Sequence, residues 1–181
     1  MRLLAAANWL RRGGLLAHQT ATLPGIAALP GHPRALARLR RFKQRPGPFL
    51  LLHDGSLRAR IRLRRWIAWR RRTARRWLHH PPADATLLLP AGGRTPVGAA
   101  WRGAIALRRA DDPPTLALLG RAGGLLFSSS LNRRGRPPAM IDRHQARRLH
   151  RAAIRLLPGP TGSGRPSRII DLRGRRPRRL R

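Results

Sequence analysis

The sequence is 181 residues long, and its 40 Lys and Arg residues against six Asp and Glu residues give a formal net charge of +34. This length suits one domain with a core of its own, and a hydrophobic content of 41% excludes a wholly disordered chain. The absence of cysteine excludes disulfides, zinc-binding thiolates and thiol nucleophiles.

Short apolar runs alternate with helical patterns along the chain, after an opening that faintly resembles a signal peptide. Asn8 and Arg11-Arg12 cut that opening short, and no apolar run reaches the roughly 20 residues of a membrane span, so we expect a cytoplasmic protein without a membrane segment. Strands are predicted at residues 15–17, 49–52, 86–89, 105–108, 125–128 and 169–172. Helices are predicted at residues 35–42, in part of 57–77, and at 115–121 and 142–151.

This order of elements predicts an α/β fold, in which a single domain is built around a twisted, mixed, open sheet. Neither an internal repeat nor a Ser/Gly linker divides the chain. The domain is expected to cover residues 1–172, and residues 173–181 are expected to form a basic C-terminal tail that is only partly ordered.

The positive charge has two explanations, which the sequence leaves open. It attracts polyanions such as nucleic acids. It also matches a compositional bias, because all the acidic residues are Asp and Lys43 is the only lysine among the 40 basic residues. Where almost every lysine has become arginine, the remaining Lys43 marks a candidate site that needs a compact point charge.

The most basic segment, residues 58–76, contains ten arginines interleaved with Trp66 and Trp69. Arginines among aromatic residues are typical of RNA-binding surfaces. We favour the alternative interpretation, an amphipathic helix whose tryptophans face the core while its arginines are solvated.

Three polar clusters are candidates for ligand binding. Lys43-Gln44-Arg45-Pro46 presents two cations that can face one anion. Ser128-Ser129-Ser130-Leu131-Asn132 follows a predicted strand, at the end where open α/β sheets bind ligands. Gly162-Ser163-Gly164-Arg165-Pro166-Ser167 offers glycines that let the backbone approach a phosphate. The chain has no phosphate-binding G-x-x-x-x-G-K-[ST] loop and no Glu, and its histidines lack metal-ligand spacing, so no metal-ligating residue is expected.

In this order the clusters resemble the YrdC/TsaC family of threonylcarbamoyl-AMP synthases. The K-x-R motif of that family reads Lys43-Gln44-Arg45 here, its S-x-N motif reads Ser130-Leu131-Asn132, and its P-S-x-I-x-D segment reads Pro166-Ser167-Arg168-Ile169-Ile170-Asp171. Its A-V-R-x-x-D-H-P stretch is similar to the residues from Ala106 to Pro113. The resemblance runs almost end to end and implies one short synthase domain with a concave basic face.

The resemblance implies a reaction and a role for each site residue. L-threonine, bicarbonate and ATP with Mg²⁺ would give threonylcarbamoyl-adenylate and pyrophosphate, and partner proteins would pass the threonylcarbamoyl group to a tRNA adenosine. Lys43 and Arg45 would be catalytic and clamp the phosphates of ATP, which Ser130, Asn132 and Ser167 would also bind. Thr20 would line the threonine pocket, and Arg108 would pair with the threonine carboxylate.

The sequence departs from the family pattern around the threonine pocket. The family's Pro-Thr-Glu has become Gln19-Thr20-Ala21, and its W-P-G-P-x-T is reduced to Pro82-Ala83-Asp84-Ala85-Thr86. One alternative is therefore a degenerate relative that binds RNA or nucleotide without making the adenylate. A small basic structural protein of the ribosome or nucleoid is a second alternative, which the ordered set of motifs disfavours.

Overall fold

The structure is a computed structural model that describes residues 1–68, 77, 80–82, 84–132 and 139–181. The helices are α1 (Leu3–Arg11), α2 (Pro33–Lys43), α3 (Leu57–Trp66), α5 (Pro113–Ala122) and α6 (Arg143–Arg151). The strands are β1 (Leu15–His18), β2 (Gly25–Ala28), β3 (Leu50–His53), β4 (Ala85–Pro90), β5 (Ala100–Trp101), β6 (Ala104–Arg109), β7 (Leu125–Ser130), β8 (Ile154–Leu157), β9 (Arg168–Asp171) and β10 (Arg178–Arg179).

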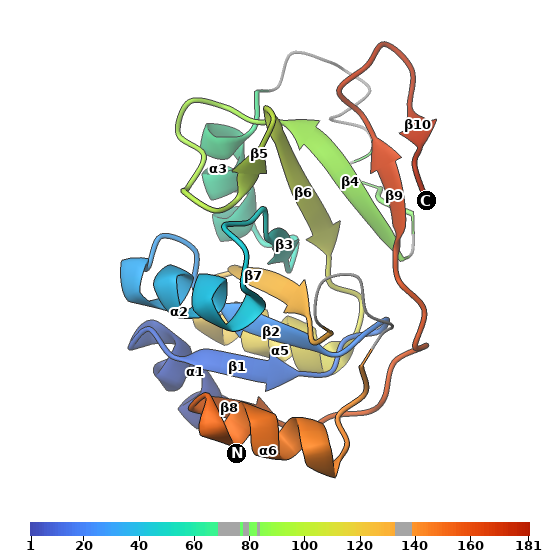
Figure 1. Cartoon of the computed structure of the whole chain (residues 1–181). Coiled ribbons are helices and arrows are strands. Elements are labelled where there is room, and N and C mark those ends of the chain that lie inside the picture. The colour runs from blue at the N-terminus through green and yellow to red at the C-terminus, as the bar shows by residue number, and fades with distance from the viewer. Residues whose placement is uncertain (69–76, 78–79, 83, 133–138) are drawn as a thin grey trace.

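Within the described residues, the strands form one mixed sheet that twists from β8 to β10 (Figure 1). Its order is β10-β9-β4-β6-β3-β7-β2-β1-β8, and β5 pairs with β6. The pairs β1–β8, β3–β6 and β4–β9 are parallel, and the other pairs are antiparallel. The structure therefore confirms the predicted single α/β domain with a mixed, open sheet.

Helices cover both faces of the sheet. Successive residues of a strand point to opposite faces, so a strand of apolar residues needs a covering layer on each side. In β1, Leu15 and Ala17 pack into one apolar core, while Leu16 between them packs into a second core. The first core includes residues of α2, α3 and α6, and the second includes residues of α1 and α5. In Figure 1, α2 and α6 lie in front of the lower strands and α5 lies behind them.

Polar side chains cap the starts of four of these helices, among them α3, where Ser56 Oγ accepts from the Ala59 N–H at 3.3 Å. The ring Nδ1 of His32 accepts from the Ala35 N–H at the start of α2. Asp112 Oδ1 accepts from the Thr115 N–H at 2.9 Å and starts α5, as expected for an Asp before two prolines. Asp142 caps α6 in the same way.

The predicted elements are present, with boundaries shifted by a few residues. The helix expected in part of 57–77 begins at Leu57 and stops at Trp66, where Ile67 bridges to Ala91. Trp66 packs partly buried against the core, as the amphipathic interpretation requires, while Trp69 lies outside the described residues. Among the described residues, none of the helices is both long enough and apolar enough to span a bilayer.

Some elements escaped the sequence analysis, among them α1, β2 and β8. The opening residues that resembled a signal peptide form α1, whose buried Ala6, Ala7 and Leu10 face the core. The segment expected to form a tail ends in β10, which pairs antiparallel with β9. The division between a domain of residues 1–172 and a tail of residues 173–181 stays a prediction.

Candidate active site

A cavity of about 500 Å³ lies where the ends of β2 and β7 approach β4, β6 and β9. Six of the seven predicted site residues line it, although they come from segments far apart in the sequence: Thr20, Arg45, Arg108, Ser130, Asn132 and Ser167. The fold thus brings together the three polar clusters and the two residues expected to bind an amino acid.

Lys43, the seventh predicted residue, lies behind the wall of the cavity. It is the last residue of α2, and its side chain is buried. Its Nζ donates to the backbone carbonyl of Ser130 at 2.6 Å and to that of Asn132. Lys43 therefore holds the loop that carries Ser130 and Asn132. Burial, with smaller contributions from Arg45 and Arg148, lowers the pKa of Lys43 to about 8.

Arg45 reaches the cavity because the chain turns sharply after Lys43. Gln44 ends α2 in the left-handed conformation, with φ of 51°. The Arg45 guanidinium lies 5.2 Å from the ring centroid of the buried Phe49, and its Nη2 donates to Ser129 Oγ at 3.2 Å. These contacts orient the guanidinium along the wall formed by β7.

The end of β7 carries serines on the cavity wall, and the neighbouring strand leaves room for them. Gly25 of β2 is paired with Ser130, and a side chain at Gly25 would place a Cβ 2.8 Å from Ser128 Oγ. Leu131 is buried, and its N–H donates to the Pro24 carbonyl at 2.9 Å. This anchor separates Ser130 from Asn132 so that both can line the cavity.

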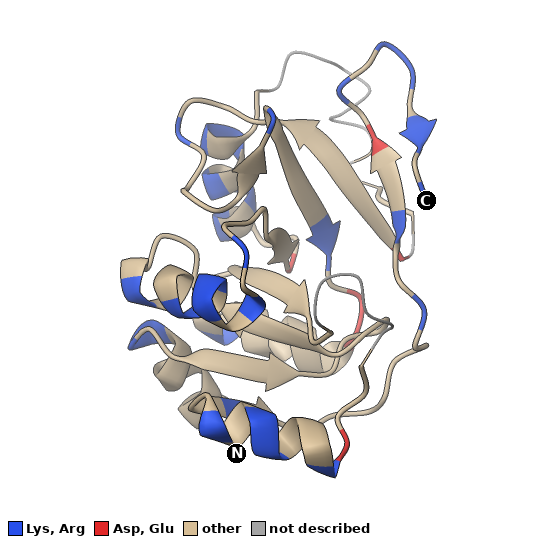
Figure 2. Cartoon of the chain, viewed as in Figure 1, with Lys and Arg blue, Asp and Glu red and all other residues tan. Residues whose placement is uncertain are grey.

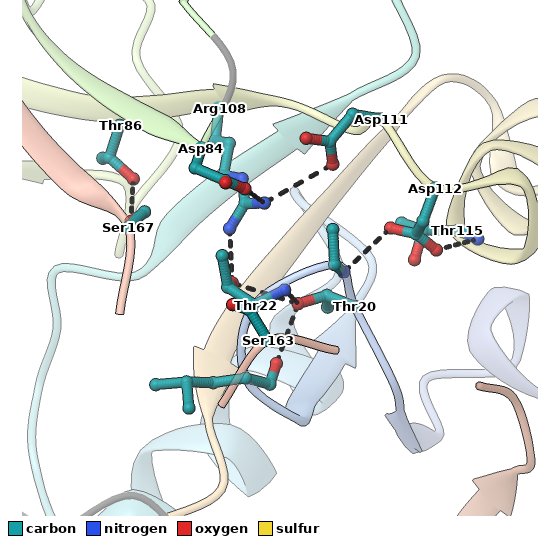
Figure 3. A network of polar contacts seen from close by, with 12 residues as sticks. Thr20, Thr22, Asp84, Thr86, Arg108, Asp111, Asp112, Thr115, Ser163 and Ser167 are labelled. Atoms are coloured by element: carbon teal, nitrogen blue, oxygen red, sulfur yellow. Dashed lines mark hydrogen bonds and ion pairs between the residues drawn. The ribbon is translucent and has the colours of Figure 1, made fainter. Parts of the chain in front are cut away.

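Ser167 lies on the opposite wall, just before β9. Its hydroxyl is 2.8 Å from the hydroxyl of the buried Thr86 on β4 (Figure 3). This pairing follows from the parallel register of the strands, which sets Thr86 beside Ile169.

Arg108 is buried, and Figure 3 shows its guanidinium beside Asp84, with Asp111 to one side and Thr22 below it. Its Nη1 donates to Thr22 Oγ1 at 2.5 Å, and its Nη2 lies 3.4 Å from Asp84 Oδ1 and 3.5 Å from Asp111 Oδ1. Thr22, Asp84 and Asp111 were not among the site residues predicted from the sequence. The scarcity of acidic residues could have marked Asp84 and Asp111 as site residues, because the sequence has only six of them and two pair with this one arginine.

The loop that carries Thr20 is held on several sides. Thr20 Oγ1 donates to the Leu23 carbonyl at 2.8 Å, and the Ala21 N–H donates to Asp112 Oδ2 at 3.3 Å. The Ser163 N–H donates to the Ala21 carbonyl and the Gly164 N–H to the Thr22 carbonyl, both at 2.9 Å. The glycine-rich segment of residues 162–164 therefore lies against the Thr20 loop.

The described residues around the cavity do not form a protein site for Mg²⁺. Mg²⁺ prefers carboxylate oxygens and substrate phosphates. Asp84 and Asp111 are the carboxylates beside Arg108, and both are ion-paired with it. In the described part of the chain, no three His, Cys, Asp or Glu side chains are grouped to hold a metal ion.

A model of the Sua5/YciO/YrdC family, described as "Telomere recombination", matches residues 8–181. The chain belongs to the Sua5/YciO/YrdC family. A relative from Chromohalobacter salexigens named threonylcarbamoyl-AMP synthase is 38% identical over 179 residues, which cover 94% of this chain and 92% of the relative. A relative of the same name from Methylobacillus flagellatus is 35% identical over 184 residues, or 95% of this chain and 96% of the relative.

Solved structures of the Sua5/YciO/YrdC family share the fold. The structure of P. abyssi Sua5 complexed with L-threonine matches 99% of this chain with a TM-score of 0.84 at 24% identity. This chain spans about half of that protein, 53% of its length. E. coli YciO matches 99% of this chain and 87% of its own, with a TM-score of 0.81 at 23% identity. At these identities the likeness concerns the fold.

Proposed function

We propose that this protein is an L-threonylcarbamoyladenylate synthase, which uses L-threonine, bicarbonate and ATP and releases pyrophosphate. The proposal is supported by the names of relatives up to 38% identical, of which the chain covers most of the length. The observation that carries it is the cavity of about 500 Å³, in which the K-x-R, S-x-N and P-S segments meet Thr20 and Arg108.

The chemistry that we propose is suited to a cavity with few acid–base groups. The threonine amine would combine with bicarbonate to form a carbamate with loss of water. A carbamate oxygen, already anionic, would attack the α-phosphorus of ATP as the bond to pyrophosphate breaks. This step needs no general base, so the protein's task is to position the reactants and neutralise charge.

In this proposal the phosphates lie between the walls of β7 and β9. Arg45, Ser130 and Asn132 would bind ATP from one wall and Ser167 from the other. Lys43 would contribute without lining the cavity. Its ammonium adds positive charge behind the β7 wall and holds the carbonyls of Ser130 and Asn132 in place. Mg²⁺ would arrive with ATP and be held chiefly by its phosphate oxygens.

The threonine carboxylate would bind at Arg108, near Thr20 and Thr22. Thr22, Asp84 and Asp111 already contact this guanidinium, so a substrate carboxylate would compete with Asp84 and Asp111 for it. Partner proteins would use the product to transfer the threonylcarbamoyl group to tRNA. We also propose that the basic surface binds RNA.

Exchange of radioactive pyrophosphate into ATP tests this function. Exchange that requires both threonine and bicarbonate is the expected result, and Ser167→Ala should reduce it, whereas Arg94→Ala, which does not line the cavity, should not. Repeating the exchange with L-serine as the substrate in place of L-threonine tests the amino-acid end of the cavity.

Two observations favour a second candidate, a relative that binds nucleotide or RNA without catalysis. Arg108 is already ion-paired with Asp84 and Asp111, and Ala21 stands where the family has Glu. ATP binding without any exchange would support this candidate and contradict the synthase.

A further inference from the structure

One edge of the sheet is open at β8, which lies at the lower end of the sheet in Figure 1. Among the described residues, β8 pairs in parallel with β1 and with no other strand. Successive residues of a strand direct their N–H and C=O groups to opposite sides, so half of these groups in β8 face away from β1. Such an edge is a template for pairing with a strand of another chain.

A groove of about 630 Å³ lies at this open edge, which we call the β8 groove. Residues of β8 line it together with Trp9 of α1 and Leu149 of α6. The two helices pack on opposite faces of the sheet, because Leu149 shares a core with Ile154, whereas Leu10 of α1 shares the other core with Leu157. The open edge therefore has a helix on either side, and a strand added there would be covered on both faces.

Positive charge in the β8 groove is not neutralised by a carboxylate. In the part of the chain that the structure describes, the ion pairs involve Arg108 and Arg173. Arg155 is exposed on β8, and its guanidinium lies 4.1 Å from the centroid of the Trp9 ring. The Arg38 guanidinium lies 5.8 Å from the same centroid. An acidic occupant would therefore meet complementary charge in this groove.

Charge and strand geometry together select the occupant. A second copy of the chain would bring its own net charge of +34 to this edge, and pairing of β8 with itself would bring like charges together. A strand added beside β8 directs alternate side chains toward α1 and toward α6. On the α1 side they meet Arg155 over Trp9, and on the α6 side they meet Ala146 and Leu149. Acidic residues suit the first side and apolar residues suit the second.

We propose that the β8 groove binds an extended acidic segment of a partner protein, in which Asp or Glu alternates with apolar residues. The segment adds to the sheet as a further strand. The groove shares no lining residue with the cavity of the candidate active site, so the inference does not depend on the proposed reaction.

The test uses three fluorescently labelled peptides of about eight residues, whose binding is measured by anisotropy at about 150 mM salt. The first alternates Glu with Val, and the second alternates Gln with Val and lacks the charge. The third has the side chains of the first but a methyl group on every backbone nitrogen, so that it has no N–H to donate. Hydrogen exchange of the β8 amides in the wild type, with and without the first peptide, reports strand pairing directly.

Two variants locate the binding site on the protein. Arg155→Gln removes the exposed charge of β8. Arg94→Gln is the matched control, because Arg94 is also exposed and does not line the groove. Thermal unfolding shows whether each variant is folded, and the comparison of peptides on the wild type needs neither variant.

We expect the first peptide to bind and to slow exchange of the β8 amides. Arg155→Gln should weaken its binding about tenfold or more, the size of a hydrogen bond between charged groups, and Arg94→Gln should stay within about twofold of the wild type. The second and third peptides should each bind at least about tenfold more weakly than the first.

Four results would overturn the inference. They are the absence of binding, equal binding of the first and third peptides, equal losses in the two variants, and unchanged exchange in β8. Self-association of the protein that slows exchange of the β8 amides without any peptide would overturn it in favour of a second copy as the occupant.

Discussion

At the scale of single residues, Lys43 is explained by the geometry of its contacts. One Nζ atom donates to two backbone carbonyls, those of Ser130 and Asn132, inside a buried space. A compact ammonium can direct its N–H bonds at both oxygens from one point, whereas a planar guanidinium spreads its donors over three nitrogens. This requirement gives a reason for a lone lysine in a chain otherwise filled with arginine.

We therefore predict that Lys43→Arg reduces adenylate formation by roughly 100-fold or more, the loss typical of one well-placed electrostatic contact. The larger guanidinium would displace the loop of Ser130 and Asn132 although the charge is kept. Pyrophosphate exchange measures the loss, and circular dichroism checks that the variant is folded. Arg178→Lys, an exposed change of the same kind, should leave the rate unaltered. Full activity in Lys43→Arg would remove the geometric argument for this lysine.

The pKa of Lys43 gives a second prediction. Because burial lowers this pKa to about 8, the free protein loses the ammonium charge as the pH rises above that value. The kcat/KM for ATP, which reports on the free enzyme, should fall above pH 8. The free energy of unfolding should change in the opposite direction and rise with pH. Between pH 8 and about 10.5 the unfolded chain keeps a proton on Lys43 that the folded protein has lost, so a rising pH favours the folded state.

The pH dependence of the Lys43→Arg variant shows whether Lys43 or another titrating group causes the decline in kcat/KM. Its guanidinium stays charged throughout the range, so its residual activity should show no decline near pH 8. A decline that persists in the variant would belong to a different group.

At the scale of elements, the connection from β8 to β9 links the two ends of the cavity. Residues 162–164 lie against the Thr20 loop, and the same segment continues into Ser167 and β9. A Cβ added to Gly162 would lie 2.1 Å from the Thr20 carbonyl oxygen, so the backbones can approach this closely only at a glycine. Movement of either segment should therefore affect both halves of the site.

We predict that Gly162→Ala raises the KM for threonine about tenfold or more and also weakens ATP binding. The added methyl group must push the Thr20 loop and the residues before Ser167 apart, since backbone atoms are on both sides of the contact. Steady-state kinetics with each substrate measures the effect. Gly93→Ala is the control, because a Cβ there meets nothing within 4 Å. A variant with normal KM values would show that the two segments move independently.

At the scale of the whole molecule, positive charge is spread over many elements. Figure 2 shows Lys and Arg on α2, α3, α6 and the C-terminal strand, with few acidic residues among them. Six acidic residues cannot neutralise 40 Lys and Arg residues, so a formal net charge of +34 remains. This distribution agrees with a compositional bias that acts on every tolerant position, and it still attracts polyanions.

We predict that any RNA bound by this surface is released steeply by salt. If six or more phosphates are contacted, affinity should fall about 1000-fold between 50 and 200 mM salt, because counterions return to the RNA. Fluorescence anisotropy with a labelled tRNA at several salt concentrations gives the slope. Tight binding that ignores salt over this range would show that stacking or shape, not charge, governs the interaction.

Most of the fold and the site could be predicted from the sequence because the signals are local. Apolar runs such as 125–128, and caps such as Asp112 before two prolines, depend on neighbours in the chain. The elements that escaped had weak local signals: β8 directly follows α6, and β2 is short and begins at Gly25. Both form strands because neighbouring strands supply their hydrogen-bond partners.

By itself, the sequence determined the α/β class, the family and six residues of the cavity wall, because motifs preserve residue types that the chemistry needs in a fixed order. Only the tertiary structure decided where each group points. It directs Lys43 at two carbonyls behind the wall and surrounds Arg108 with Thr22, Asp84 and Asp111. Most of these contacts join residues far apart in the sequence, and sheet register and burial, which no local pattern encodes, bring them together.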